Sequence, residues 1–173
     1  MDKTEKYITG TQQWVEDIVV GLNFCPYAKK ELVNNTIDYV VVESDDIKEA
    51  IDAVDVCSQQ LIQNEKIETT LIIFPYGYDN FDVYLDLLDA ANGVLSVMGY
   101  EGIFQLASFH PDYCFEGASD SDVENYTNRS PWPMLHLIRE DSMARALALY
   151  KSPEDIPETN MPVARGKGIN FFT

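Results

Sequence analysis

Short apolar runs rich in β-branched residues alternate with longer stretches in which apolar residues recur at helical spacing. The runs expected to form strands are residues 36–43, 69–74, 103–109 and 134–139. The stretches expected to form helices are residues 5–22, 47–62, 81–98 and 141–150. Strands that alternate with helices of this length favour βαβ units. The order therefore predicts an α/β fold with a largely parallel four-stranded sheet flanked by helices.

The direction of the fourth predicted strand separates this fold from its alternative. If residues 134–139 run antiparallel, the chain forms a two-layer α+β sandwich. No repeat or linker divides residues 1–150, so we interpret them as a single α/β domain. Residues 151–173 contain three prolines and two glycines without apolar periodicity, and we expect an irregular C-terminal tail there.

The charge of the chain limits its partners. Its 173 residues include 12 Lys and Arg against 29 Asp and Glu, a formal net charge of −17. Such an acidic protein repels phosphates, so we expect neither nucleic acid nor a membrane surface as a partner. The charged N-terminus and the absence of an apolar stretch of about 20 residues predict a cytoplasmic protein. No two of the three cysteines are spaced as Cys-x-x-Cys, which argues against a structural zinc site.

Cys25 lies in a turn-forming segment, residues 21–28, in which we expect chemistry. Gly21 and Asn23 suit the end of the first helix, and Pro26 suits the first turn of a new one. Cys25 would then be the N-cap, where the helix dipole and free N–H groups lower the pKa of a thiol and make it reactive. The competing interpretation is a small buried apolar residue.

The two histidines occupy different predicted positions. His110 ends a predicted strand, at the edge where α/β sheets bind ligands, which suits an acid, a base or a metal ligand. His136 alternates with Met134 and Ile138 and shares their face of the sheet. A buried histidine bonded to a backbone carbonyl is the alternative for His136. Cys57 lies on the apolar stripe of its helix and is expected in the core.

Three of the four arginines lie within seventeen positions of this acidic chain, at Arg129, Arg139 and Arg145. Asn125, Asn128 and Ser130 add side-chain donors beside Arg129. Arginine forks with amide and hydroxyl neighbours are typical of carboxylate and phosphate sites, so we expect an anionic small molecule as ligand. The alternative is that the arginines pair with internal carboxylates.

The segments GLNFCPYA (residues 21–28), FHPDYCF (109–115) and residues 125–140 resemble a family of bacterial and plant proteins, the domain-of-unknown-function 1415 family. The similarity covers nearly the whole chain. It groups these segments into one site and implies no particular reaction. Position 114 is more often arginine in this family, so Cys114 is not expected to share a family role. The residues expected to contact substrate are Asn23, Tyr113, Asn125, Asn128, Arg129, Ser130, His136 and Arg139.

These observations favour a small-molecule enzyme, a cysteine-dependent hydrolase, transferase or thiol redox enzyme. Cys25 would be the nucleophile and His110 the general acid or base, in one concave site where residues 21–28 meet residues 109–139. No GxGxxG or P-loop motif is present, so we expect no nucleotide cofactor. One alternative is a metal site formed by Cys25 and His110 with His136 or Asp112. The other is a non-catalytic domain that binds a small molecule or a protein.

Overall fold

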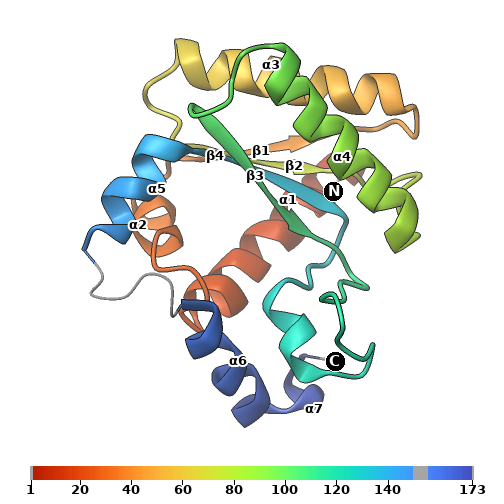
Figure 1. Cartoon of the computed structure of the whole chain (residues 1–173), viewed down its shortest axis with the longest axis vertical. Helices are drawn as coiled ribbons and strands as arrows, with labels where there is room; N and C mark the ends of the chain where they lie inside the picture. The colour runs from red at the N-terminus through yellow and green to blue at the C-terminus, as the bar shows by residue number, and fades with distance from the viewer. Residues whose placement is uncertain (1, 150–155, 173) are drawn as a thin grey trace.

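A four-stranded sheet lies between two helical layers in the computed structural model, which describes residues 2–149 and 156–172. The strands are β1 (Ile37–Val41), β2 (Thr69–Ile73), β3 (Phe104–Phe109) and β4 (Met134–Arg139). Helices α3 (Ile47–Gln63) and α4 (Phe81–Val97) cover one face of the sheet, and α1 (Lys3–Trp14) crosses the other (Figure 1). The mixed α/β class expected from the sequence is confirmed.

The sheet order β1-β2-β4-β3 corrects the expectation of a largely parallel sheet. Only β1 and β2 are parallel, and β4 runs antiparallel to both of its neighbours. The reason lies in the connection: the chain leaves β3 at Phe109 and returns at Met134, the residue paired with it. Parallel neighbours need a crossover, usually a helix across the face of the sheet, and residues 110–133 do not provide one. The antiparallel β4 of the alternative is therefore present, but with helices on both faces.

The main core lies between the sheet and the α3–α4 layer. Ile72, Leu135 and Leu137 point to this side and are buried against α3 and α4. Cys57 is 2% exposed within this cluster, as its position on the apolar stripe predicted. Asp46 caps α3 by accepting a hydrogen bond from the backbone N–H of Lys48 at 2.8 Å.

The N-terminal layer bends before it reaches the second helix. α1 continues into a π-helical segment, η1 (Val15–Val20), and α2 begins at Ala28 and ends at Asn34. Asn23 adopts a positive φ of 56°, which reverses the chain between these helices. The segment from residue 21 to residue 28 is therefore a turn between two helices, as expected, and it lies against the sheet face that α1 covers.

The expected irregular tail instead forms two helices, over residues 156–167 and 169–172, whereas residues 150–155 lie outside the described residues. α6 (Ile156–Lys167) contains Pro162, and α7 (Ile169–Phe172) follows it. An interior proline disfavours a helix locally, so tertiary contacts must compensate. The amide of Asn160 donates to the carbonyl of Phe24 at 2.7 Å, and Ala164 is fully buried. No helix in the described part of the chain has the length and apolar character needed to cross a membrane.

Candidate functional site

A small cavity lies between the N-terminal helices and the sheet face opposite α3 and α4. Alternate residues of a strand share a face, so Thr69 and His136 both point to this side. Cys25 and Tyr27 reach the cavity from the turn before α2, and Glu31 reaches it from α2 itself. The cavity measures about 50 Å³ and is otherwise walled by apolar side chains. We call it the inner cavity.

His136 is held in one tautomer by its neighbour on β2. Its Nε2 lies 2.6 Å from the hydroxyl oxygen of Thr69, and that hydroxyl donates its only proton to the carbonyl of Leu137 at 2.7 Å. The contact therefore requires Nε2–H of His136 to donate to Thr69, which leaves Nδ1 as an acceptor. Burial lowers the pKa of His136 to about 4, so the ring is neutral at pH 7.

Cys25 lines the same cavity, but its thiol does not have the lowered pKa expected from the sequence. Burial raises the pKa of Cys25 above its ordinary value, and hydrogen bonding from the amides of Ala28 and Tyr27 offsets this only in part. Cys25 is not the N-cap expected from the sequence, because α2 begins at Ala28 and its N-cap is Tyr27, although the amides of both residues lie close enough to lower the thiol pKa. The loss of solvent around the sulfur outweighs them, and Cys25 is a neutral thiol at pH 7.

His110 lies away from Cys25, in the α4 layer. Its ring packs against Tyr84 and Phe81, with ring centroids 5.0 and 5.1 Å apart. Both ring nitrogens contact the backbone: Nε2 lies 2.9 Å from the carbonyl of Tyr78, and Nδ1 accepts from the amide of Asp112 at 3.0 Å. His110 is fully buried, and burial lowers its pKa. The structure thus brings Cys25 together with His136 rather than with His110.

The two arginines expected to bind an anion donate to backbone carbonyls instead. Arg139 reaches the end of α3, where its guanidinium group donates to the carbonyls of Leu61, Asn64 and Ile67. This contact is a C-terminal cap for α3.

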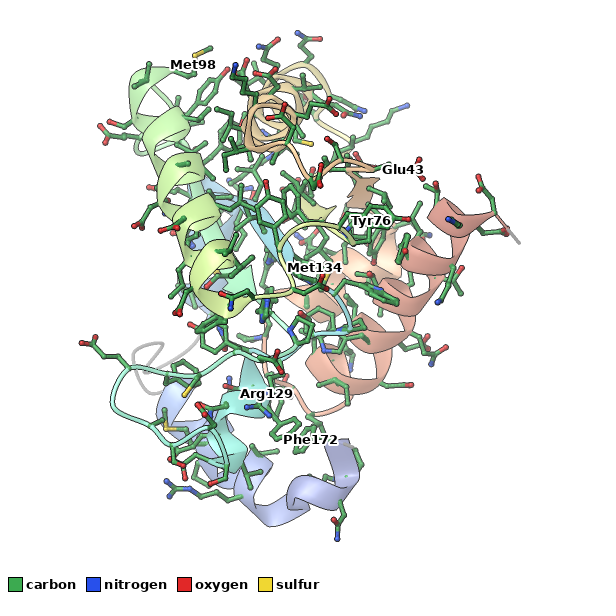
Figure 2. The ribbon with its side chains drawn as sticks, turned by 90° about the vertical axis from the view of Figure 1, so that its right-hand side faces the viewer. Glu43, Tyr76, Met98, Arg129, Met134 and Phe172 are labelled. Carbon is green, nitrogen blue, oxygen red and sulfur yellow. The ribbon has the colours of Figure 1, made fainter. Side chains whose placement is uncertain are left out.

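Arg129 lies at the opposite end of β4, beside Phe172 and the C-terminal helices (Figure 2). It donates to the carbonyls of Tyr113 at 3.1 Å and Asp120 at 2.8 Å, and its guanidinium group stacks over the Tyr126 ring at 4.5 Å. Among the described residues, neither Arg129 nor Arg139 forms a salt bridge. Neither the expected anion pocket nor the alternative of internal ion pairs accounts for these contacts.

The other residues expected to contact substrate organise the β3–β4 connection. Asn125 is fully buried, accepts from the amide of Phe115 and donates to the carbonyl of Ser119. Asn128 and Ser130 donate to the carbonyls of Ser108 and Trp132. Tyr113 packs against Phe81 and Phe115, and Asn23 is exposed in its turn. These contacts give the connection a fixed structure, although it contains only one short helical turn, η2 (Val123–Thr127).

A larger opening, which we call the outer pocket, adjoins the inner cavity. Its volume is about 450 Å³, and Tyr27 and Glu31 contribute to the walls of both spaces. The remaining walls come from α2 and the turn before it, from the residue that precedes β2, and from α5 (Glu140–Leu147) with the residue Leu149 after it. These residues are Pro26, Lys30, Glu68, Ser142, Arg145, Ala146 and Leu149.

A model of the family described as "Protein of unknown function (DUF1415)" matches residues 6–173. The chain belongs to the DUF1415 family. The match spans both the inner cavity and the outer pocket, and it confirms the resemblance seen in the sequence. No curated protein and no solved structure matches the chain.

Three polar residues of this DUF1415 site were not singled out from the sequence: Tyr27, Glu31 and Thr69. Tyr27 lies within the family-like segment at residues 21–28, which is the one signal that pointed to it. Glu31 follows two lysines in a short helix, where a glutamate is normally exposed, yet it is 1% exposed here. No three His, Cys, Asp or Glu side chains within residues 2–149 and 156–172 are grouped to hold a metal ion.

Proposed function

We propose that this DUF1415 protein is an enzyme that acts on a small molecule through Cys25, with His136 as the proton acceptor. The observation that carries the proposal is that both side chains line the inner cavity. A nucleophile and a base in one site, with the base oriented by a third group, is the arrangement of cysteine-dependent hydrolases and transferases. Thr69 supplies that third group.

The proposed step starts from two neutral side chains. The Cys25 thiol transfers its proton to Nδ1 of His136 while the sulfur forms a bond to a carbonyl carbon of the substrate, whose C=O π electrons move to the oxygen. When the C=O bond forms again, the bond to the leaving group breaks, and that group takes the proton from Nδ1 of His136. Nε2–H of His136 remains bonded to Thr69 throughout, which keeps the ring in place. The amides of Tyr27 and Ala28 stabilise negative charge on the sulfur as it develops. The chemistry requires no cofactor.

The sizes of the two spaces assign them different roles in this proposal. A cavity of about 50 Å³ holds a few water molecules or one small reacting group, because each water needs roughly 10–15 Å³. The outer pocket, at about 450 Å³, lies within the range of small-molecule sites. We infer that the body of the substrate binds in the outer pocket and that its reacting group enters the inner cavity. The three free cysteines agree with a cytoplasmic location, where thiols stay reduced.

Alkylation with iodoacetamide tests the pairing of Cys25 with His136. Peptide mass spectrometry follows each cysteine separately in wild type and in His136→Gln, whose amide can still donate to Thr69 but cannot accept the thiol proton. At pH 7.5 we expect Cys25 to react about a hundredfold more slowly in the variant, the lower end of typical general-base effects. Cys114 is the internal control and keeps its rate. An unchanged rate at Cys25 would show that His136 is not its base.

A further inference from the structure

The inner wall of the outer pocket carries two buried polar atoms without hydrogen-bond partners. The hydroxyl of Tyr27 is one of them, on a side chain 3% exposed, and Oε1 of Glu31 is the other, on a side chain 1% exposed. The second carboxylate oxygen of Glu31 accepts from the hydroxyl of Thr36 at 2.5 Å. Oε1 forms a salt bridge of 3.5 Å with the ammonium of Lys30, an exposed side chain, but no hydrogen bond joins them. Buried polar atoms in native structures usually have hydrogen-bond partners, and both of these residues line the outer pocket, where a bound ligand would supply donors to them.

Acidic and basic groups have separate places around this pocket. Glu31 belongs to the buried wall and Glu68 is partly buried, whereas Lys30 and Arg145 are exposed at the rim. Ser142 joins the two sets: its hydroxyl donates to Glu68 at 2.6 Å and accepts from Arg145 at 2.9 Å. The carboxylate of Glu68 and the guanidinium group of Arg145 are therefore separated by a single hydroxyl group. An α-amino acid has its ammonium and carboxylate on one carbon, so its two charged groups are separated by a similarly short distance.

We propose that the outer pocket binds a zwitterion, an α-amino acid or a close derivative with an apolar side chain. Its ammonium group has three donors, and three acceptors line the inner wall: Oε1 of Glu31, the hydroxyl of Tyr27 and the carboxylate of Glu68. Its carboxylate binds Arg145 and Lys30 at the rim. Its side chain lies along Pro26, Ala146 and Leu149.

The charges favour a zwitterion over a simple anion. A phosphate or carboxylate without a cationic group faces Glu31 and Glu68 and the field of a protein with net charge −17. An ammonium group is attracted by the same charges. Lys30 and Arg145 then balance the ligand's carboxylate, so both charges of the ligand are paired. This inference goes beyond the proposed function, because every group of this ligand lies in the outer pocket and its binding does not need Cys25.

Calorimetric titration with leucine and three analogues tests the inference on the wild-type protein. N-acetylleucine lacks the ammonium group, leucinamide lacks the carboxylate, and inorganic phosphate is an anion alone. We expect leucine to bind, and N-acetylleucine and phosphate to bind at least about tenfold more weakly, because each charged hydrogen bond lost costs about that factor. Leucinamide binds with intermediate affinity. Absence of leucine binding, or equal binding of leucine and N-acetylleucine, overturns the proposal.

Three charge-removing substitutions locate the bound ligand. Glu31→Gln should lower the affinity for leucine about tenfold or more. Glu49→Gln removes the same charge from an exposed position and is the control, whose affinity should not change. Arg145→Gln weakens leucine but leaves leucinamide unchanged. Circular dichroism shows whether each variant is folded, and the analogue series remains decisive if Glu31→Gln is not. If wild type and Arg145→Gln bind leucine with equal affinity, the ligand's carboxylate does not bind Arg145.

The two proposals fail in different ways. Cys25→Ser should bind leucine like wild type, because the outer pocket does not include the sulfur. If leucine binds but the reactivity of Cys25 is independent of His136, the enzyme proposal fails and the binding site stands. If leucine does not bind but the reactivity of Cys25 depends on His136, the enzyme proposal stands and the proposal of a zwitterionic ligand is wrong.

Discussion

The hydroxyl of Thr69 on β2 determines which nitrogen of His136 on β4 is free to accept a proton. Thr69 uses its proton on the carbonyl of Leu137, so His136 must donate from Nε2 over the 2.6 Å contact. The antiparallel pairing of β2 with β4 brings these residues to the same face of the sheet. Nδ1 is therefore an acceptor on a neutral ring that lines the same cavity as Cys25.

Removing the hydroxyl in Thr69→Val should affect both stability and reactivity. The Leu137 carbonyl and Nε2–H of His136 lose their partner at a site where Thr69 is 2% exposed. We expect the free energy of unfolding in urea to fall by about 1–3 kcal/mol, the cost of unsatisfied buried groups. Alkylation of Cys25 should slow as well, because the ring of His136 is no longer oriented. Thr69→Ser restores the hydroxyl and should recover the alkylation rate, whereas a variant that stays slow would point to packing alone.

The alkylation rate of Cys25 should keep rising with pH beyond the neutral range. Burial holds the pKa of Cys25 above the ordinary thiol value of 9.0, so the thiolate fraction still increases above pH 9. Measured with iodoacetamide between pH 6 and 10, the rate should change little in the neutral range, where the neutral thiol transfers its proton to neutral His136, and should rise as the thiolate forms at higher pH. A rate that reaches its maximum below pH 9 would mean that the thiolate is already fully formed there, contrary to the raised pKa of Cys25.

Stability should fall on acidification through the titration of His136. In the unfolded chain this histidine binds a proton below pH 6.5, but in the folded protein it does so only below about pH 4. The unfolded state therefore binds more protons between these values, and the free energy of unfolding decreases as the pH falls from 6.5 to 4. Allowing for solvent screening, the loss is about 2 kcal/mol. His110 acts in the same direction, because burial also lowers its pKa.

Urea unfolding of His136→Gln at pH 7 and pH 4.5 isolates the contribution of His136. The variant should lose less stability over this interval than wild type, and the difference between the two proteins measures the histidine alone. A difference of zero would mean that His136 is readily protonated in the folded state. His110 and the carboxylates are present in both proteins, so their contributions to the pH dependence of stability cancel in the comparison.

Arg139→Leu should destabilise the protein without changing ligand binding. The guanidinium group of Arg139 donates to three carbonyls at the end of α3, and leucine supplies no donor. We expect a loss of about 1–3 kcal/mol in urea unfolding. Arg165→Gln, at an exposed salt bridge with Glu124, is the matched control and should change stability by less than about 1 kcal/mol. If phosphate stabilises wild type more than chloride does at equal ionic strength, and Arg139→Leu abolishes that gain, Arg139 binds an anion after all.

Local patterns in the chain were sufficient to predict the helices and strands and the environment of some residues within them. The apolar stripe through Cys57 predicted a core residue, and the alternation of His136 with Met134 and Ile138 predicted a shared face of β4. The turn at residues 21–28 was recognisable because Gly21, Asn23 and Pro26 have restricted or special backbone preferences. These predictions concern a residue and its immediate neighbours in sequence, where periodicity and backbone sterics decide the outcome.

Only the tertiary structure decided which elements meet. A strand has the same two-residue period whether its neighbour is parallel or antiparallel, so the sequence of β4 could not show its direction. His110 was expected to act as the acid or base and His136 to contact substrate, but packing assigned His110 to α4 and His136 to the cavity with Cys25. The sequence likewise does not show which acceptor an arginine binds. The guanidinium group of Arg139 donates to three carbonyls at the end of α3. The sequence by itself thus determined the faces of each element, and the contacts between elements distant in the chain determined the site, because burial and hydrogen-bond partners are properties of the assembled fold.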